Sequence, residues 1–108
     1  MSEKEASAVL EEGMLTSNEP GFYLDGKFGI RHENLMLCVK DEKSLYGQFM
    51  RFDTVTMVPF DLEAIDLSLL SEREKQLLNQ YHQMVYKTIA PYLEGEIKLW
   101  LKEATREV

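Results

Sequence analysis

Residues 18–34 read NEPGFYLDGKFGIRHEN, and this stretch decides the local fold. Near its middle, the pair Asp25-Gly26 is typical of a tight turn between two antiparallel strands. Glu19 and Glu33 lie on either side of that turn. The sequence therefore predicts two carboxylates on neighbouring strands near the same turn region.

A second turn signal, Pro20-Gly21, directly follows the first glutamate. Proline fixes φ and lacks a donor, and glycine admits left-handed conformations, so we expect a strand over residues 13–18 to end here. Residues 28–40, FGIRHENLMLCVK, lack helical spacing and are expected to form a single strand. Within that strand, Cys38 is interpreted as a small buried hydrophobic side chain and not as a nucleophile.

Alternation along this strand places Arg31 and Glu33 on one face, because side chains two residues apart in a strand share a face. The same face continues into three large apolar residues, Leu35, Leu37 and Val39. A charged pair at the head of an apolar face is expected to be partly buried, and buried charges need partners. Two interpretations remain open, a buried ion pair alone or an ion pair beside a bound cation.

The remaining sequence predicts one more strand and two helices. Residues 47–60 are rich in aromatic and β-branched residues and favour a third strand, and residues 61–70 are a connector. The motif SERE from Ser71 is a capping box that begins a helix. Its apolar stripe consists of Leu77, Leu78, Tyr81, Met84, Val85 and Ile89. With a second helix over residues 94–105, the predicted class is α+β, a small antiparallel sheet of about three strands followed by two C-terminal helices.

Composition and charge exclude several classes of function. The 108 residues are 44% hydrophobic and 10% aromatic, which suffices for a modest core in one domain or part of one. The formal net charge of −7 argues against binding nucleic acid or an anionic membrane surface, because both require clustered Lys and Arg. Residues 1–70 contain 13 Asp and Glu but only 6 Lys and Arg, whereas residues 71–108 contain six of each. A solvated acidic surface and a cation site both remain compatible with this asymmetry.

Targeting signals and catalytic motifs are missing from the sequence. No run of apolar residues could span a membrane, the start MSEKEASAVLEEG lacks a secretion signal, and a single cysteine forms no internal disulfide, so we expect a cytoplasmic protein. There is no phosphate loop, nucleophile elbow, H-E-x-x-H motif or cysteine pair at metal spacing. His82 is interpreted as a helix-surface or packing residue. The remaining chemical groups are Glu19, Glu33, Arg31 and Tyr23, which are too few to hold a divalent metal well.

Residues 11–38, EEGMLTSNEPGFYLDGKFGIRHENLMLC, resemble the last catalytic stretch of Xaa-Pro aminopeptidases. These enzymes belong to the creatinase and methionine aminopeptidase superfamily, peptidase family M24, with the pita-bread fold. In that family, glutamates in [T/S]-x-E-P-G-x-Y and G-[I/V]-R-x-E-[N/D] segments are two of five protein ligands to a metal pair. Glu19 and Glu33 match them, which implies that Glu19 binds one metal and Glu33 bridges both. Tyr23 and Arg31 match groups that are hydrogen-bonded around a ligand carboxylate.

The resemblance also implies an activity and a division of the chain. Residues 1–60 would be the C-terminal strands of the catalytic domain, and residues 61–108 the helical C-terminal extension of Xaa-Pro aminopeptidases, together in one structural unit. The implied hydrolase is a dinuclear metalloprotease that removes the N-terminal residue from peptides with proline second, using water activated between two divalent metals. Manganese is the expected metal, with zinc and cobalt as alternatives.

The chain also departs from the family. The two aspartate ligands, the histidine ligand and the N-terminal domain have no counterpart, and Asp25 and Asp53 lie outside the aspartate motif. We therefore expect this chain alone to bind no metal pair and to be inactive without the missing N-terminal part of the enzyme. An exposed sheet edge and apolar patch predict self-association. A non-catalytic interaction or assembly module derived from the pita-bread fold is the alternative.

Overall fold

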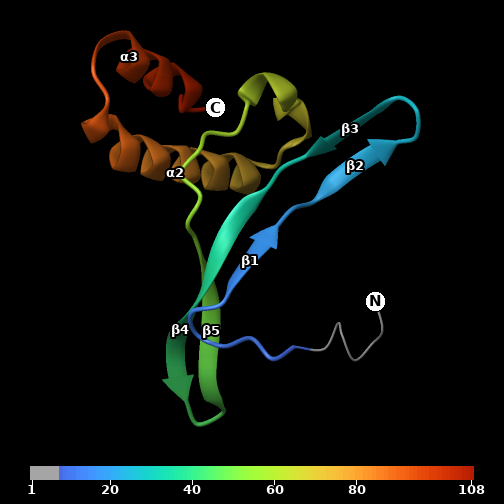
Figure 1. Ribbon diagram of the computed structural model, residues 1–108, viewed down its shortest axis with the longest axis vertical. Helices are drawn as coiled ribbons and strands as arrows, with labels where there is room; N and C mark the ends of the chain where they lie inside the picture. The colour runs from blue at the N-terminus through green and yellow to red at the C-terminus, as the bar shows by residue number, and fades with distance from the viewer. Residues whose placement is uncertain (1–7) are drawn as a thin grey trace. The chain divides into compact units, whose positions relative to one another are not determined.

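The computed structural model describes residues 8–108 (Figure 1). Residues 1–7, which are part of the stretch judged to lack a secretion signal, lie outside this range. One compact unit ends at Thr56, and a second runs from Met57 to Val108. None of the helices in the described range is long and apolar enough to cross a membrane.

Within residues 8–56, the first unit contains five antiparallel strands. Strands β1 (Leu15–Asn18), β4 (Asn34–Ser44) and β5 (Gly47–Thr54) form a three-stranded sheet in the order β1-β4-β5. Strands β2 (Gly21–Leu24) and β3 (Phe28–Arg31) form a separate two-stranded ladder. Figure 1 shows that β2 continues the path of β1 and that β3 leads into β4. The predicted small antiparallel sheet is confirmed.

Both ladders share one register. Asn18 pairs with Asn34 in the first ladder, and Gly21 pairs with Arg31 in the second. In each pair the two residues are equally far from Gly26, which adopts φ +68° at the turn between β2 and β3. The chain from β1 to β4 is therefore one long hairpin with a single break in its hydrogen bonding.

The break corrects two expectations. Pro20-Gly21 starts no turn, because Gly21 is already the first residue of β2. Opposite Pro20, the amide of His32 donates to the Pro20 carbonyl oxygen at 3.2 Å, but proline has no N–H to return the second ladder bond. The strand predicted over residues 28–40 is accordingly divided into β3 and β4 without a change of register.

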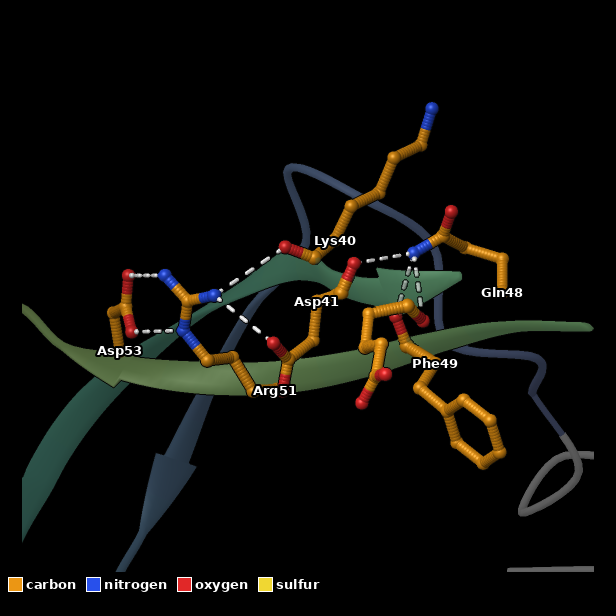
Figure 2. Close-up of polar contacts among 7 residues, drawn as sticks. Lys40, Asp41, Gln48, Phe49, Arg51 and Asp53 are labelled. Atoms are coloured by element: carbon orange, nitrogen blue, oxygen red, sulfur yellow. Dashed lines mark hydrogen bonds and ion pairs between the residues drawn. The ribbon is translucent and has the colours of Figure 1, made fainter. Parts of the chain in front are cut away.

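The far end of the sheet contains a β-bulge. The register between β4 and β5 shifts between Lys40 and Lys43, and the Gln48 side chain compensates by donating to the Asp41 carbonyl oxygen at 2.8 Å. Figure 2 shows this contact beside Arg51, whose Nε donates to Asp53 Oδ1 at 3.1 Å. Strand β5 ends at Thr54, earlier than the predicted strand over residues 47–60.

The second unit is helical. Two 3₁₀ turns, η1 (Leu62–Ala64) and η2 (Leu67–Leu69), precede α2 (Glu72–Ile89), and η3 (Ala90–Tyr92) joins α2 to α3 (Gly95–Ala104). Helix α2 begins with the predicted capping box, in which the Glu74 amide donates to Ser71 Oγ and the Ser71 amide donates to the Glu74 carboxylate. Both predicted C-terminal helices are confirmed.

The core of this unit lies between the helices. Val85, Ala90 and Leu101 are buried, and partly buried side chains pack around them, namely Met57, Tyr81, Tyr86, Ile89 and Leu93. The predicted stripe is partly wrong, because Leu77 and Met84 are exposed while His82 is fully buried. The buried face is rotated toward His82, whose Nε2 accepts a hydrogen bond from the Phe60 amide at 3.0 Å.

Candidate metal centre

Glu19 and Glu33 occupy directly opposed positions on the hairpin. They lie between the ladder pair Asn18 and Asn34 and the hydrogen bond that joins His32 to Pro20. In an antiparallel ladder, the position next to a hydrogen-bonded pair is a non-hydrogen-bonded pair, where opposed Cα atoms are only about 4.5 Å apart. The two glutamate side chains therefore leave the backbone side by side on the same face.

Each carboxylate has one contact that orients it. Ser17 Oγ donates to Glu19 Oε2 at 2.9 Å, and Arg31 Nε lies 3.5 Å from Glu33 Oε2. Each contact connects residues two apart on one strand path, which share a face. Only one oxygen of each carboxylate is engaged in this way, which leaves the other for a cation.

The expected burial of the Arg31–Glu33 pair is wrong. The Arg31 side chain is 51% exposed and the Glu33 side chain 41%. Leu35, the apolar residue next to Glu33 on this face, is itself 46% exposed and does not cover the pair. An exposed ion pair contributes only about 0–1 kcal/mol to stability, and Arg31 therefore orients Glu33 more than it stabilises the fold.

Tyr23 lies on the same face as the two glutamates, because positions 19, 21 and 23 alternate with the opposite face. Its partner across the ladder is Gly29, and the next pair toward the glutamates is Gly21 with Arg31. One face of the hairpin therefore collects all four residues that the sequence singled out. The opposite face is apolar and carries Phe22, Leu24, Phe28 and Ile30.

The donor set fits part of a divalent metal centre. Two opposed carboxylates repel each other in the absence of a cation, and their oxygens suit manganese or another hard divalent ion. Within residues 8–108, no group of three or more His, Cys, Asp or Glu side chains could hold a metal ion. The hairpin therefore offers two carboxylates, and a divalent metal centre here would need further donors to complete its coordination sphere.

The other titratable residues considered from the sequence lie elsewhere. Asp53 is engaged by Arg51, and this hydrogen bond and charge raise the pKa of Arg51 above its ordinary value. Asp25 lies in the turn beyond β2, at the opposite end of the hairpin ladder from the glutamates. His82 is fully buried and accepts the Phe60 amide, so this histidine is a packing residue. Burial lowers its pKa, and the charge of Arg106 lowers it further.

Sequence reasoning assigned no role to Ser17, Gly21 and Gly29, although all three stand in the two quoted motifs. Ser17 orients Glu19 through its hydroxyl, and both glycines lie under the Tyr23 ring. The signal was available, since these residues alternate with period two on the arms that carry the glutamates. It was overlooked because Pro20-Gly21 was interpreted as a turn, which would have ended the alternation.

Comparison with known sequences covers nearly the whole chain. Residues 48–108 match the family described as the C-terminal region of peptidase M24, and residues 1–40 match metallopeptidase family M24. Residues 41–47 lie between the two matches and contain the bulge and the β4–β5 turn. The first match covers more than half of the chain.

Individual relatives agree with the family matches. Xaa-Pro aminopeptidase 2 of Sus scrofa is 44% identical over 89% of this chain and 15% of its own length. A probable Xaa-Pro aminopeptidase P of Coprinopsis cinerea is 41% identical over 94% of this chain and 17% of its own length. The chain thus spans about one sixth of these relatives.

A solved structure shows the same fold. X-prolyl aminopeptidase from Caenorhabditis elegans, described as a cytosolic enzyme with a di-nuclear active site, matches with a TM-score of 0.75 and 35% sequence identity. The match covers 92% of this chain and 17% of that enzyme. The resemblance inferred from the two glutamate motifs is confirmed: the chain belongs to metallopeptidase family M24, with residues 48–108 in its C-terminal region.

Proposed function

We propose that this chain supplies Glu19 and Glu33 as two protein ligands of a dinuclear metal centre in an Xaa-Pro aminopeptidase. The observation that carries the proposal is the opposition of the two carboxylates on one hairpin face. That position is costly for like charges unless a cation lies between them. A pair of ligands 14 residues apart in sequence is thereby brought to adjacent positions in space.

The residues of this chain would have different roles at the metal centre. Glu19 would bind one metal and Glu33 would bridge both, while Arg31 and Ser17 each hold one carboxylate oxygen so that the other is directed to the cations. Tyr23 adds a hydroxyl on the same face. When bound, two divalent cations supply Lewis-acid activation of water and of the peptide carbonyl. Manganese is the proposed metal, with zinc and cobalt as alternatives.

The remaining parts of the proposal concern the complete enzyme. Its substrates would be peptides with a free N-terminus and proline as the second residue. The enzyme would be located in the cytoplasm. The proposed arrangement assigns residues 1–60 to the catalytic domain and residues 61–108 to its helical extension. The other ligands come from the remaining part of the enzyme, so the 108-residue chain alone should be inactive. The retention of two opposed glutamates favours this function over a non-catalytic interaction module.

A chimera tests the proposal directly. The segment of the C. elegans X-prolyl aminopeptidase that aligns with this chain is replaced by residues 8–108, and hydrolysis of an Xaa-Pro peptide is measured with added Mn²⁺. We expect the chimera to be active. Glu19→Gln and Glu33→Gln should each reduce kcat by at least 10²-fold, because loss of a carboxylate removes about 3 kcal/mol or more of transition-state stabilisation at such a site.

The matched control is Glu42→Gln, an identical change of charge on β4 away from the glutamate pair. It should retain nearly full activity. The metal content of each purified chimera, measured by elemental analysis, should fall in the two ligand variants only. A folded chimera that keeps its activity and metal in both ligand variants would refute the assigned roles.

A further inference from the structure

The Tyr23 ring occupies the space above two glycines. A β-carbon placed on Gly29 would lie 2.5 Å from Tyr23 Cδ1 and 3.0 Å from Cε1. A β-carbon placed on Gly21 would lie 2.5 Å from the Tyr23 hydroxyl oxygen and 2.8 Å from Cε2. Contacts this short do not occur between real atoms, so any side chain larger than hydrogen at either position displaces the ring.

These contacts fix the direction of the ring. The Cδ1 edge, close to the Tyr23 backbone, lies over Gly29, which is directly opposite Tyr23 in the ladder. The hydroxyl end lies over Gly21, which is two residues nearer to Glu19. The ring therefore runs along the hairpin, and its hydroxyl is directed toward the end that carries the glutamate pair.

Backbone conformation does not explain either glycine. The glycines with positive φ in residues 8–108 are Gly13, Gly26, Gly47 and Gly95. Gly21 and Gly29 instead lie in regular strands, where glycine weakens the sheet unless another group approaches closely.

Coverage of a glycine by an opposed aromatic ring is a known way to stabilise a sheet, and it accounts for Gly29 alone. Gly21 is not directly opposite Tyr23, because its own ladder partner is Arg31. A ring that extended away from the glutamates would cover Gly29 and would leave the space above Gly21 empty. The second glycine is therefore required only by the observed direction of the ring.

We propose that Gly21 and Gly29 are positioning residues, forming a groove that holds the Tyr23 ring along the hairpin and directs its hydroxyl toward Glu19 and Glu33. The inference rests on the proposed role of these glutamates as metal ligands. A hydroxyl held in this direction donates a hydrogen bond to a ligand carboxylate and fixes which oxygen faces the cation. Arg31, opposite Gly21, performs the corresponding task from the other arm.

Proton NMR of the 108-residue chain tests the groove without any metal. The Hα protons of Gly21 and Gly29 should be shifted upfield by the Tyr23 ring current, and the Tyr23 Hε protons should show NOEs to Gly21 Hα. Tyr23→Leu should abolish both upfield shifts. Gly21→Ala should abolish the Hε contact. The control Ile30→Val, on the opposite face of β3, should leave the shifts and NOEs unchanged.

Paramagnetic Mn²⁺ then tests the direction of the hydroxyl. Two opposed carboxylates attract Mn²⁺ weakly even without the other ligands, and line broadening falls steeply with distance from the ion. In the wild-type chain, the Hε protons of Tyr23 should be broadened several-fold more than its Hδ protons. In Gly21→Ala, the Hε and Hδ protons should be broadened equally, because the added methyl group displaces the ring from its direction toward the glutamates.

A double mutant separates positioning from a general effect on the hairpin. In the Tyr23→Leu background, Gly21→Ala should leave the broadening of the Glu19 and Glu33 protons unchanged, because there is no ring to displace. Broadening of both glutamates with equal broadening of Hε and Hδ in the wild-type chain would overturn the positioning role alone. Absence of broadening at Glu19 and Glu33 would overturn the inferred direction of the hydroxyl toward bound metal, even if the NOEs from Tyr23 to the glycines are present. The role of the two glutamates as ligands in the complete enzyme is decided separately, by the metal content of the chimera variants.

Discussion

Glu19 and Glu33 place two negative charges at opposed positions of one hairpin face, with Arg31 beside only one of them. Like charges directly opposite each other destabilise an antiparallel pair. The metal-free hairpin therefore carries a built-in repulsion. Removing one charge should relieve it.

We expect Glu19→Gln to stabilise the metal-free chain by about 0.2–1 kcal/mol, the range for cross-strand pairs. Glutamine retains an oxygen that accepts the hydrogen bond from Ser17, so the repulsion is the main interaction lost. The measurement is native-state hydrogen exchange of the Cys38 amide in the presence of EDTA. This amide donates to the Met14 carbonyl oxygen at 2.8 Å and so reports on the hairpin.

Glu42→Gln makes the same change of net charge on β4 and serves as the control. It should alter exchange of the Cys38 amide less than Glu19→Gln does. Equal effects of the two substitutions would show that net charge, and not the opposed pair, determines the stability of the hairpin.

His82 makes the second unit sensitive to acid. Burial lowers the pKa of His82 below its ordinary value of 6.5, so the unfolded chain binds more protons than the folded chain between the two pKa values. Stability is therefore full above about pH 6.5 and is lost as the pH falls toward the lowered pKa. Protonation also removes the Nε2 lone pair that accepts the Phe60 amide.

Urea unfolding followed by circular dichroism at 222 nm should show a free energy of unfolding that falls between pH 7.5 and pH 5. His82→Gln, which keeps an acceptor but no titratable ring, should lessen this dependence at a cost of about 1–3 kcal/mol at neutral pH. If the wild-type chain and the variant have the same slope against pH, His82 is not the titrating group.

For single residues, the sequence was informative where a residue belongs to a family motif. Arg31 and Glu33 share one face, as alternation predicted. The position of Tyr23 and Glu19 on that same face was not predicted, because a turn was expected at Pro20-Gly21. The burial of His82 was not predictable, because it depends on Phe60, 22 residues earlier in the chain. A hydrogen bond between such distant positions leaves no periodic signal in the sequence.

Among the secondary-structure elements, α2 is connected to the last residues of the chain by one side chain. The Asn79 side-chain nitrogen donates to the main-chain oxygen of Val108 at 3.1 Å, and the Val108 amide donates to Asn79 Oδ1 at 2.9 Å. Both contacts are partly buried. A single amide group therefore satisfies a donor and an acceptor of the segment that follows α3.

Asn79→Ala should destabilise the helical unit by about 1–3 kcal/mol, because two main-chain groups lose their partners. Asn79→Asp keeps the acceptor for the Val108 amide and loses the donor, so its effect should be intermediate. Thermal unfolding at 222 nm gives the stabilities, and exchange of the Val108 amide reports the contact itself. An alanine variant as stable as the wild type would show that the contact is energetically neutral.

The elements themselves were predicted unequally. The capping box and the period of α2 gave its start within one residue, since both signals are local. The hairpin arms were misjudged at Pro20-Gly21, because a proline opposite His32 interrupts hydrogen bonds without turning the chain. The rotation of the buried face of α2 depended on which side met residues 57–60, which the stripe alone does not specify.

For the molecule as a whole, the exposed apolar face of the β2–β3 hairpin is a surface of the first unit that requires explanation. Phe22 is 58% exposed and Phe28 57%, with ring centroids 6.3 Å apart. Leu24 and Ile30 on the same face are each 39% exposed. Contiguous exposed apolar side chains of this kind favour association.

We expect the 108-residue chain to self-associate through this face. Sedimentation velocity should show a concentration-dependent increase in mean mass, which the double substitution Phe22→Ser and Phe28→Ser should reduce. Leu45→Ser, at a fully exposed position in the β4–β5 turn, is the control and should have little effect. A clean monomer at high concentration, or an equal reduction in the control, would contradict this prediction.

The constant register of the hairpin limits how its length can vary. Side chains alternate between faces, so one residue inserted into a single arm would move Glu19 and Glu33 to opposite faces. Insertions in the turn around Gly26 leave both arms in register, and paired insertions between turn and glutamates also preserve the pairing. Viable length changes in this segment should therefore occur at the tip or in matched pairs. A single odd insertion in one arm should abolish the proposed metal site while the chain still folds.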